Sequence, residues 1–193
     1  MSAAGKVTTG FSLPYVALYA NSGGTITYTS GQKLARGVNV TISPESSDDN
    51  IFYADNAAAE NDGGRFTGGT VTLEVDGLLG TTRKLIFGLP ASTGGWTSYG
   101  DDMSVPYVGI GYIARAMSDG VTTYAPTVLV KCRFSLPDIT AATQTDAIDW
   151  QTESLEASIF RGDDSNHNWI HVGDEYSTEA LAEAALKTLL NIA

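Results

Sequence analysis

The chain has 193 residues, of which 42% are hydrophobic and 17% charged, and its formal net charge at pH 7 is -11. This length suits one domain with its own core, so we predict a single domain over residues 1–193. With only 11 Lys and Arg against 22 Asp and Glu, the composition excludes a surface that grips nucleic acid, because phosphate binding needs clustered cations.

The first residues are small and polar, and residues 1–12 are predicted to form a flexible arm. They lack the apolar segment of a signal peptide, and no window approaches the roughly 18 apolar residues of a membrane span, so folding in the cytoplasm is expected. The single cysteine, Cys132, alternates with Val130 and Phe134 and is predicted to be a small buried hydrophobe.

Two strand pairs are predicted in the first half of the chain. Residues 15–19 and 25–29 flank a Gly-containing turn and indicate a hairpin. The strands ending at Ile42 and Asp76 alternate between apolar and polar residues, so each should have one buried face.

Between these last strands, residues 44–66 form a long acidic loop that is too long and too apolar in its middle for an ordinary turn. Its candidate contact residues are three consecutive apolar residues and four acids: Ile51, Phe52, Tyr53, Asp48, Asp49, Asp55 and Asp62.

A short helix is predicted over residues 78–87, because apolar residues recur at helical spacing and Gly88 supplies a stop. The following loop, residues 91–102, carries Trp96 and Tyr99, which are expected to cover a core edge or a neighbouring molecule.

Three more strands are predicted after this loop. Residues 106–116 are apolar enough for a central strand, and residues 121–134 contain Pro126, which indicates an edge or a bulge. Residues 147–160 change phase, which predicts a bulge near Thr152 and Ser154.

The C-terminal segment, residues 177–191, is predicted to be a helix with Ser177 as its N-cap and an apolar stripe of Leu181, Ala185 and Leu189. With about eight strands, the fold class is α+β, mainly β. We expect two packed antiparallel sheets, as a sandwich or partial barrel, with a short central helix and this C-terminal helix.

Motifs for cofactors and metals are weak. Gly109, Gly111 and Ala114 have the spacing of a dinucleotide-binding turn, but the required helix and acid are missing, so room on one face of a strand explains them better. His167 and His171 lack the Glu of a zinc motif, and Asp48, Asp49, Asp55 and Asp62 do not follow a calcium-loop pattern. No cofactor or metal is predicted.

No serine or cysteine has a recognisable base nearby, so an enzyme is not predicted. The tripeptides Arg161-Gly162-Asp163 and Asn39-Val40-Thr41 match an adhesion motif and a glycosylation acceptor, but both need an extracellular setting that nothing in the chain supports.

Several long segments resemble, in the right order, the major tail protein of long, non-contractile-tailed phages of Gram-positive hosts. The similarity runs from Gly10 to Trp169 and, more loosely, through the final helix. It is carried by residues 10–56 (GFSLPYVALYANSGG…), 66–78 (FTGGTVTLEVDGL), 105–134 (VPYVGIGYIARAMSDG…) and 148–169 (IDWQTESLEASIFRG…).

This resemblance implies a structural virion protein that polymerises as stacked hexameric rings into the tail tube, each subunit lending strands to a continuous inner barrel. Its partners would be further copies of itself, a tape measure protein, and distal tail and tail terminator proteins. DNA would pass through an acidic lumen without specific binding, and no membrane would be involved. Residues 44–66 would then reach the next ring and make the inter-ring contact.

Three alternatives stay open from the sequence. The acidic loop could be a self-packed Ω-loop of the monomer. The chain could be a carbohydrate-binding β-sandwich, a lectin or adhesin module that uses Trp96, Tyr99 and the acidic loop as a sugar platform. The related tube of a bacterial secretion machine would share the same physics.

Overall fold

The computed structural model describes residues 5–139, 141, 143 and 150–193. It confirms the mainly β, α+β class. The strands are β1 (Val7–Ser22), β2 (Thr25–Lys33), β3 (Gly37–Ser46), β4 (Asn50–Ala54), β5 (Ala57–Asp62), β6 (Phe66–Val75), β7 (Val108–Ser118), β8 (Val121–Phe134), β9 (Glu153–Phe160) and β10 (Ile170–Val172), and the helices are α1 (Gly80–Phe87) and α2 (Glu179–Leu189).

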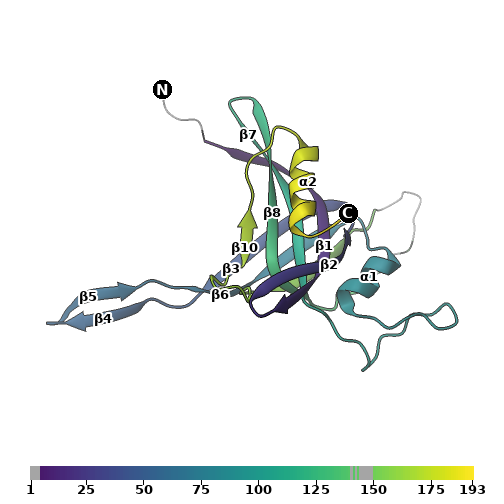
Figure 1. Cartoon of the computed structure of the whole chain (residues 1–193), viewed down its shortest axis with the longest axis horizontal. Helices are drawn as coiled ribbons and strands as arrows, with labels where there is room; N and C mark the ends of the chain where they lie inside the picture. Colours follow the sequence, from purple (N-terminus) through teal and green to yellow (C-terminus); the bar gives the residue numbers. More distant parts are fainter. Residues whose placement is uncertain (1–4, 140, 142, 144–149) are drawn as a thin grey trace.

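The main body is one curled antiparallel sheet of eight strands in the order β2-β1-β7-β8-β9-β6-β3, with β10 paired to β8 (Figure 1). Strand β3, at one end of this order, approaches β1, the second strand from the other end, because the Phe11 ring of β1 lies against Gly37 of β3. The body is therefore a partial barrel formed by one curled sheet, and not two large sheets packed on each other. The second sheet is the separate β4–β5 hairpin.

The larger core fills the inside of this curl. Strict alternation places Val71, Leu73 and Val75 of β6 inward, where none has measurable exposure. Helix α1 lies against the same core through Ile86 and Phe87. It ends where predicted, because Gly88 takes the left-handed conformation (φ 59°) that favours glycine.

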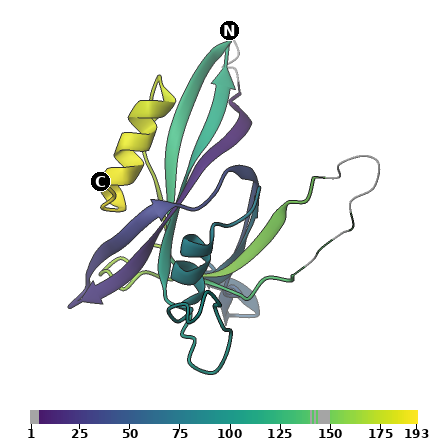
Figure 2. The same ribbon diagram turned by 90° about the vertical axis from the view of Figure 1, so that its right-hand side faces the viewer.

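Helix α2 covers the opposite face of β1, β7 and β8 (Figure 2). A Cβ on Gly109 would stand 2.4 Å from the Tyr28 ring, and one on Gly111 would stand 2.8 Å from Leu190. Both glycines lie within β7, so they make room for Tyr28 and α2 and do not form a strand-to-helix turn.

The predicted N-terminal arm is wrong for most of its length. Residues 7–12 belong to β1 and pair with β7, from Val7 opposite Met117 to Ser12 opposite Ile113. Their small polar side chains give no local strand signal, and the hydrogen bonds come from a partner about 100 residues away. Residues 1–4 lie outside the described part.

The predicted bulge near Thr152 and Ser154 is also wrong. Strand β9 begins at Glu153 and pairs with β6 without a register shift. Trp150 precedes the strand and is 83% exposed, so the apparent change of phase came from counting a residue that is not in the sheet. Residues 147–149 of the predicted strand lie outside the described residues.

Pro126 lies where β8 becomes a local edge, as one of the two predicted alternatives has it, and not at a bulge. Strand β8 has β7 on one side and β9 and β10 on the other, and its irregularity against β7 lies between the pairs Val108/Cys132 and Ile110/Leu129. The Pro126 carbonyl accepts the N–H of Gly173 at 2.8 Å, directly after β10 ends. Proline, which has no backbone N–H to donate, thus lies where the pairing between β8 and β10 stops.

The C-terminal helix is present, with two corrections. Its N-cap is Thr178, whose hydroxyl accepts the N–H of Leu181, and not Ser177. Its buried residues are Ala182, Leu186 and Leu190, whereas Leu181 and Leu189 are 52% and 45% exposed. Neither helix in the described part of the chain is long and apolar enough to cross a membrane.

Cys132 is buried as predicted, with no measurable exposure. Burial raises the pKa of its thiol far above the ordinary value. Burial therefore disfavours the thiolate form that reacts.

Candidate functional site

The predicted acidic loop is a projecting arm, which we define as residues 47–65. Its strands β4 and β5 pair antiparallel and extend from the end of the β3–β6 pair, away from the body (Figure 1). The arm is shorter than the predicted loop, because residues 44–46 continue β3 and Ser46 still pairs with Phe66.

The tip of the arm is a two-residue turn formed by Asp55 and Asn56, whose φ angles are 50° and 64°. Two successive positive φ angles define the type I′ turn of tight hairpins, and Asp and Asn tolerate this conformation better than other non-glycine residues. The Asp-Asn pair between Ala54 and Ala57 was therefore a hairpin signal that the sequence analysis missed.

Every residue of β4 and β5 is exposed. Phe52 and Tyr53 are 63% and 64% exposed, and Ile51 is 39% exposed. Successive strand residues point to opposite faces, so both faces of the arm carry a large apolar side chain. The arm is thus not a self-packed Ω-loop, and an isolated two-stranded hairpin is marginally stable in water.

The root of the arm is fixed by specific hydrogen bonds. The Ser47 N–H donates to the Arg65 carbonyl at 2.8 Å, and the Arg65 N–H donates to the Ser47 hydroxyl at 3.0 Å. The Asp49 carboxylate accepts the Gly64 N–H at 3.0 Å and the Asn61 amide at 3.2 Å. Asp49 therefore joins the two chains of the root, a structural role that spacing alone could not reveal.

The seven predicted contact residues all lie in the arm but at different levels. Asp49 and Asp62 are near the root, where Asp62 forms an exposed ion pair with Arg65 at 3.6 Å. Asp48 is exposed in the linking segment, and Asp55 forms the turn. Ile51, Phe52 and Tyr53 remain as the exposed apolar group available for a partner.

The body supports the arm through stacked rings that the sequence analysis did not connect. Phe66, directly after the arm, stacks on Trp169 with ring centroids 4.5 Å apart and planes inclined by 10°. The segment before Trp169 is held by Asp163, which accepts bonds from Lys131 at 2.9 Å and from the Tyr19 hydroxyl at 2.8 Å. The Lys131 hydrogen bond is the main cause that lowers the pKa of Asp163, so this carboxylate is charged at neutral pH.

Substituting Gly64 should disturb the root, whereas the same change at Gly63 should not. A Cβ on Gly64 would stand 2.2 Å from the Ser47 carbonyl oxygen, but a Cβ on Gly63 meets nothing within 4 Å. We expect Gly64→Ala to weaken the root by about 1–3 kcal/mol, a typical cost of overpacking. Amide hydrogen exchange at Ser47 and Arg65 measures this loss. Equal exchange rates in the Gly64→Ala and Gly63→Ala variants would contradict this prediction, because they would show that the root adjusts to the added methyl group without loss of stability.

A second feature is the polar face of β3, β6 and β9, on the side opposite the larger core. Register places nine polar side chains in three rows across these strands: Asn39, Glu74 and Ser154; Thr41, Thr72 and Glu156; and Ser43, Thr70 and Ser158. We call this set the polar face. Its only charged members are two glutamates.

The third feature is a pair of open sheet edges. Within the described residues, β2 pairs only with β1, and β3 pairs only with β6. Each strand therefore has backbone N–H and C=O groups on its outer side, although the Tyr28 carbonyl of β2 accepts the Asn191 amide at 3.0 Å, and Val38 on β3 is 52% exposed. Open edges of this kind are templates for pairing with another chain.

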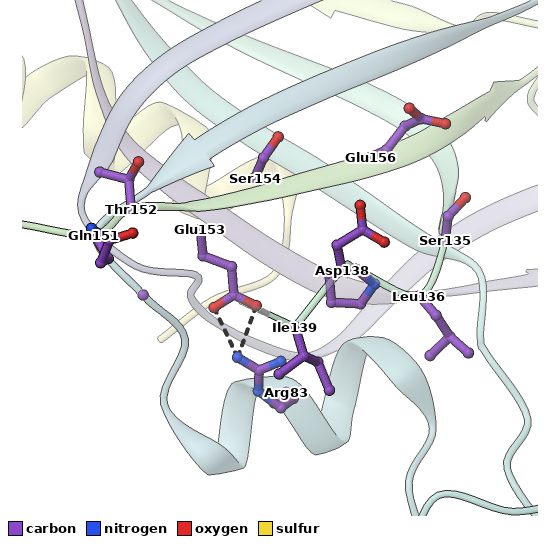
Figure 3. Close-up of a pocket in the computed structure, with 12 residues that line it drawn as sticks. Arg83, Ser135, Leu136, Asp138, Ile139, Gln151, Thr152, Glu153, Ser154 and Glu156 are labelled. Atoms are coloured by element: carbon purple, nitrogen blue, oxygen red, sulfur yellow. Dashed lines mark hydrogen bonds and ion pairs between the residues drawn. The ribbon is translucent and has the colours of Figure 1, made fainter. Parts of the chain in front are cut away.

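A pocket near the start of α1 is lined by Arg83, Asp138, Glu153 and Glu156 (Figure 3). Glu153 is engaged in the structure, since Arg83 Nη2 lies 2.8 Å from both of its carboxylate oxygens and the Leu78 N–H donates to it at 3.2 Å. This ion pair links α1 to β9.

The histidines do not converge. His167 has a φ of 53° and contacts the Gly162 carbonyl through Nδ1 at 3.1 Å, and His171 lies in β10. The described part of the chain contains no group of three or more His, Cys, Asp or Glu placed to hold a metal. No protein-family model and no curated protein sequence matches this chain.

Proposed function

We propose that this protein is a self-assembling structural subunit, the tail tube protein of a long-tailed phage, which stacks as hexameric rings and conducts DNA through its lumen. The observation that carries the proposal is the arm. It is a hydrogen-bonded hairpin that projects from the body with exposed apolar residues on both faces, and packing within the subunit gives no reason for them. The resemblance from Gly10 to Trp169 implies that the copies assemble as stacked hexameric rings.

The open edges support ring formation. Pairing between β2 of one copy and β3 of the next would join two different edges, which is a heterologous contact. Such contacts close into a ring when the rotation between copies allows it, and a closed ring removes both edges. Each subunit would then lend its curled sheet to a continuous barrel.

The polar face suits a channel wall. Glu74 and Glu156 give these nine side chains a negative charge, and a cation enters only where the third row continues into Arg133 of β8, opposite Ser158. At contact distance in water, like charges repel by about 1 kcal/mol. Repeated in every ring, this repulsion would prevent passing DNA from binding to the wall.

In this role the subunit belongs to the virion tail and is assembled in the host cytoplasm. Its main partner is a second copy of itself, with tape measure, distal tail and tail terminator proteins as further partners implied by the resemblance. The carbohydrate-binding alternative is less well supported, because the arm and the loop with Trp96 and Tyr99 lie at opposite ends of the molecule and do not form one platform (Figure 1).

Electron microscopy of the concentrated, purified protein tests this proposal. Hollow tubes or stacked rings are the expected result, with assembly increasing steeply with protein concentration, as mass action requires. A protein that remains monomeric at high concentration in analytical ultracentrifugation, and that binds glycans on an array, would refute it in favour of the lectin reading.

A further inference from the structure

We infer that the turn carrying Trp96 is the docking element for the arm of a second copy of this chain. This inference rests on the proposed function and adds the receiving surface to it. The turn lies in the segment between α1 and β7, at the end of the long axis opposite to β4 and β5 (Figures 1 and 2).

The turn holds its tryptophan in a fixed position without burying it. Thr93 and Trp96 exchange backbone hydrogen bonds of 2.9 and 3.1 Å around Gly94 and Gly95, whose φ angles are 60° and 85°. A hydrogen bond of 2.8 Å between the Ser92 and Thr97 hydroxyls closes the base of the turn. Trp96 is nevertheless 80% exposed, and Tyr99 is 47% exposed.

An exposed tryptophan on a preorganised turn has the properties of an interface anchor. Tryptophan and tyrosine are enriched among the residues that dominate binding energy. A turn already held in its bound shape also loses little conformational entropy on association. The hydrogen bonds of the turn therefore distinguish Trp96 from an ordinary exposed residue, whose side chain and backbone are not held in place.

Charge is compatible with the arm as the occupant. Residues 91–100 contain no charged side chain and the nearby Lys84 ammonium donates to the Ser92 hydroxyl, whereas Asp101 and Asp102 follow directly. An acidic arm with Asp55 and Glu60 would therefore approach a turn that is itself uncharged, from the side of the Lys84 cation. Its aromatic residues Phe52 and Tyr53 can then pack on Trp96.

Position also favours this pairing. Because the arm and the Trp96 turn lie at opposite ends of one molecule, copies aligned head to tail bring the arm of one against the turn of the next (Figure 1). Such a contact joins two different surfaces, so one end of a stack always has a free arm and the other a free turn. Further copies can therefore add at either end. The arm and the turn together would define the direction of stacking.

Disulfide trapping between separately prepared variants tests this contact. Phe52→Cys protein and Trp96→Cys protein are mixed, allowed to assemble and mildly oxidised, and cross-linked peptides are identified by mass spectrometry. The native Cys132 has no measurable exposure, so its background is low. The control replaces Trp96→Cys with Val121→Cys, at a position 63% exposed at the start of β8.

We expect at least a tenfold higher yield for positions 52 and 96 than for positions 52 and 121, and only in assembled material. A second pair, Ala58→Cys with Ser98→Cys, leaves all the aromatic residues intact in case Trp96→Cys blocks assembly. Tubes that form without cross-links in either pair would overturn this inference and leave the proposed function standing. Failure of the unmodified protein to assemble would overturn both.

Discussion

Replacing residues 48–64 with an Asn-Gly turn is expected to give a folded subunit that no longer forms tubes. The Ser47 N–H already donates to the Arg65 carbonyl, so these two residues can flank a type I′ turn of two residues. Folding should survive because every residue of β4 and β5 is exposed and the core residues of β6 lie elsewhere. A shorter connection also lowers the entropy cost of closing the loop.

The stability of this variant should stay within about 0.5 kcal/mol of the wild type, as for surface changes that remove no buried contact. Thermal unfolding followed by circular dichroism measures it, and sedimentation with electron microscopy measures assembly. If tubes still form, the arm does not carry the inter-ring contact.

A point variant separates the apolar contact from the length of the arm. Phe52→Ser removes a side chain that is 63% exposed, and Val121→Ser removes another apolar side chain of the same exposure at the start of β8. Only Phe52→Ser should raise the protein concentration needed for assembly, since buried aromatic residues dominate interfaces. Equal effects of the two substitutions would mean that assembly responds to general surface hydrophobicity.

The sequence predicts best where local periodicity and burial agree. Alternation in β6 continues through Val71, Leu73 and Val75, and the structure buries all three. The end of α1 was equally predictable, because a left-handed Gly88 stops a helix without any distant partner. In both cases the physical cause lies within a few residues of the element it determines.

Prediction fails where the cause is a distant partner. Residues 7–12 become strand because β7 offers its backbone groups, and Trp150 lies outside β9, whose pairing with β6 begins at Glu153 opposite Val75. The candidate site shows the same limit. Its residues were found by length and composition, but the joint formed by Asp49 and Gly64 depends on how two chain segments meet.

Helix α2 shows this limit most clearly, because its apolar face is wider than the surface that it buries. The sequence offers two neighbouring stripes, Leu181-Ala185-Leu189 and Ala182-Leu186-Leu190. Period alone does not choose between them, because both recur every four residues. The structure buries the second stripe because Gly109 and Gly111 open a groove in β7 that receives Leu186 and Leu190.

Truncating one leucine from each stripe therefore gives a matched pair with very different expected costs. Leu186→Ala should destabilise the protein by about 2–5 kcal/mol, because Leu186 is 1% exposed and its loss leaves a cavity against β7. Leu181→Ala should cost under about 0.5 kcal/mol, because Leu181 is 52% exposed. Since small domains are stable by only about 5–15 kcal/mol, the first loss is large enough to measure precisely by urea unfolding. Equal midpoints for the two variants would mean that α2 docks through the other stripe. If only Leu186→Ala lowers the slope of the unfolding free energy against urea concentration, α2 detaches before the sheet unfolds. That result would also show that α2 docks through Leu186.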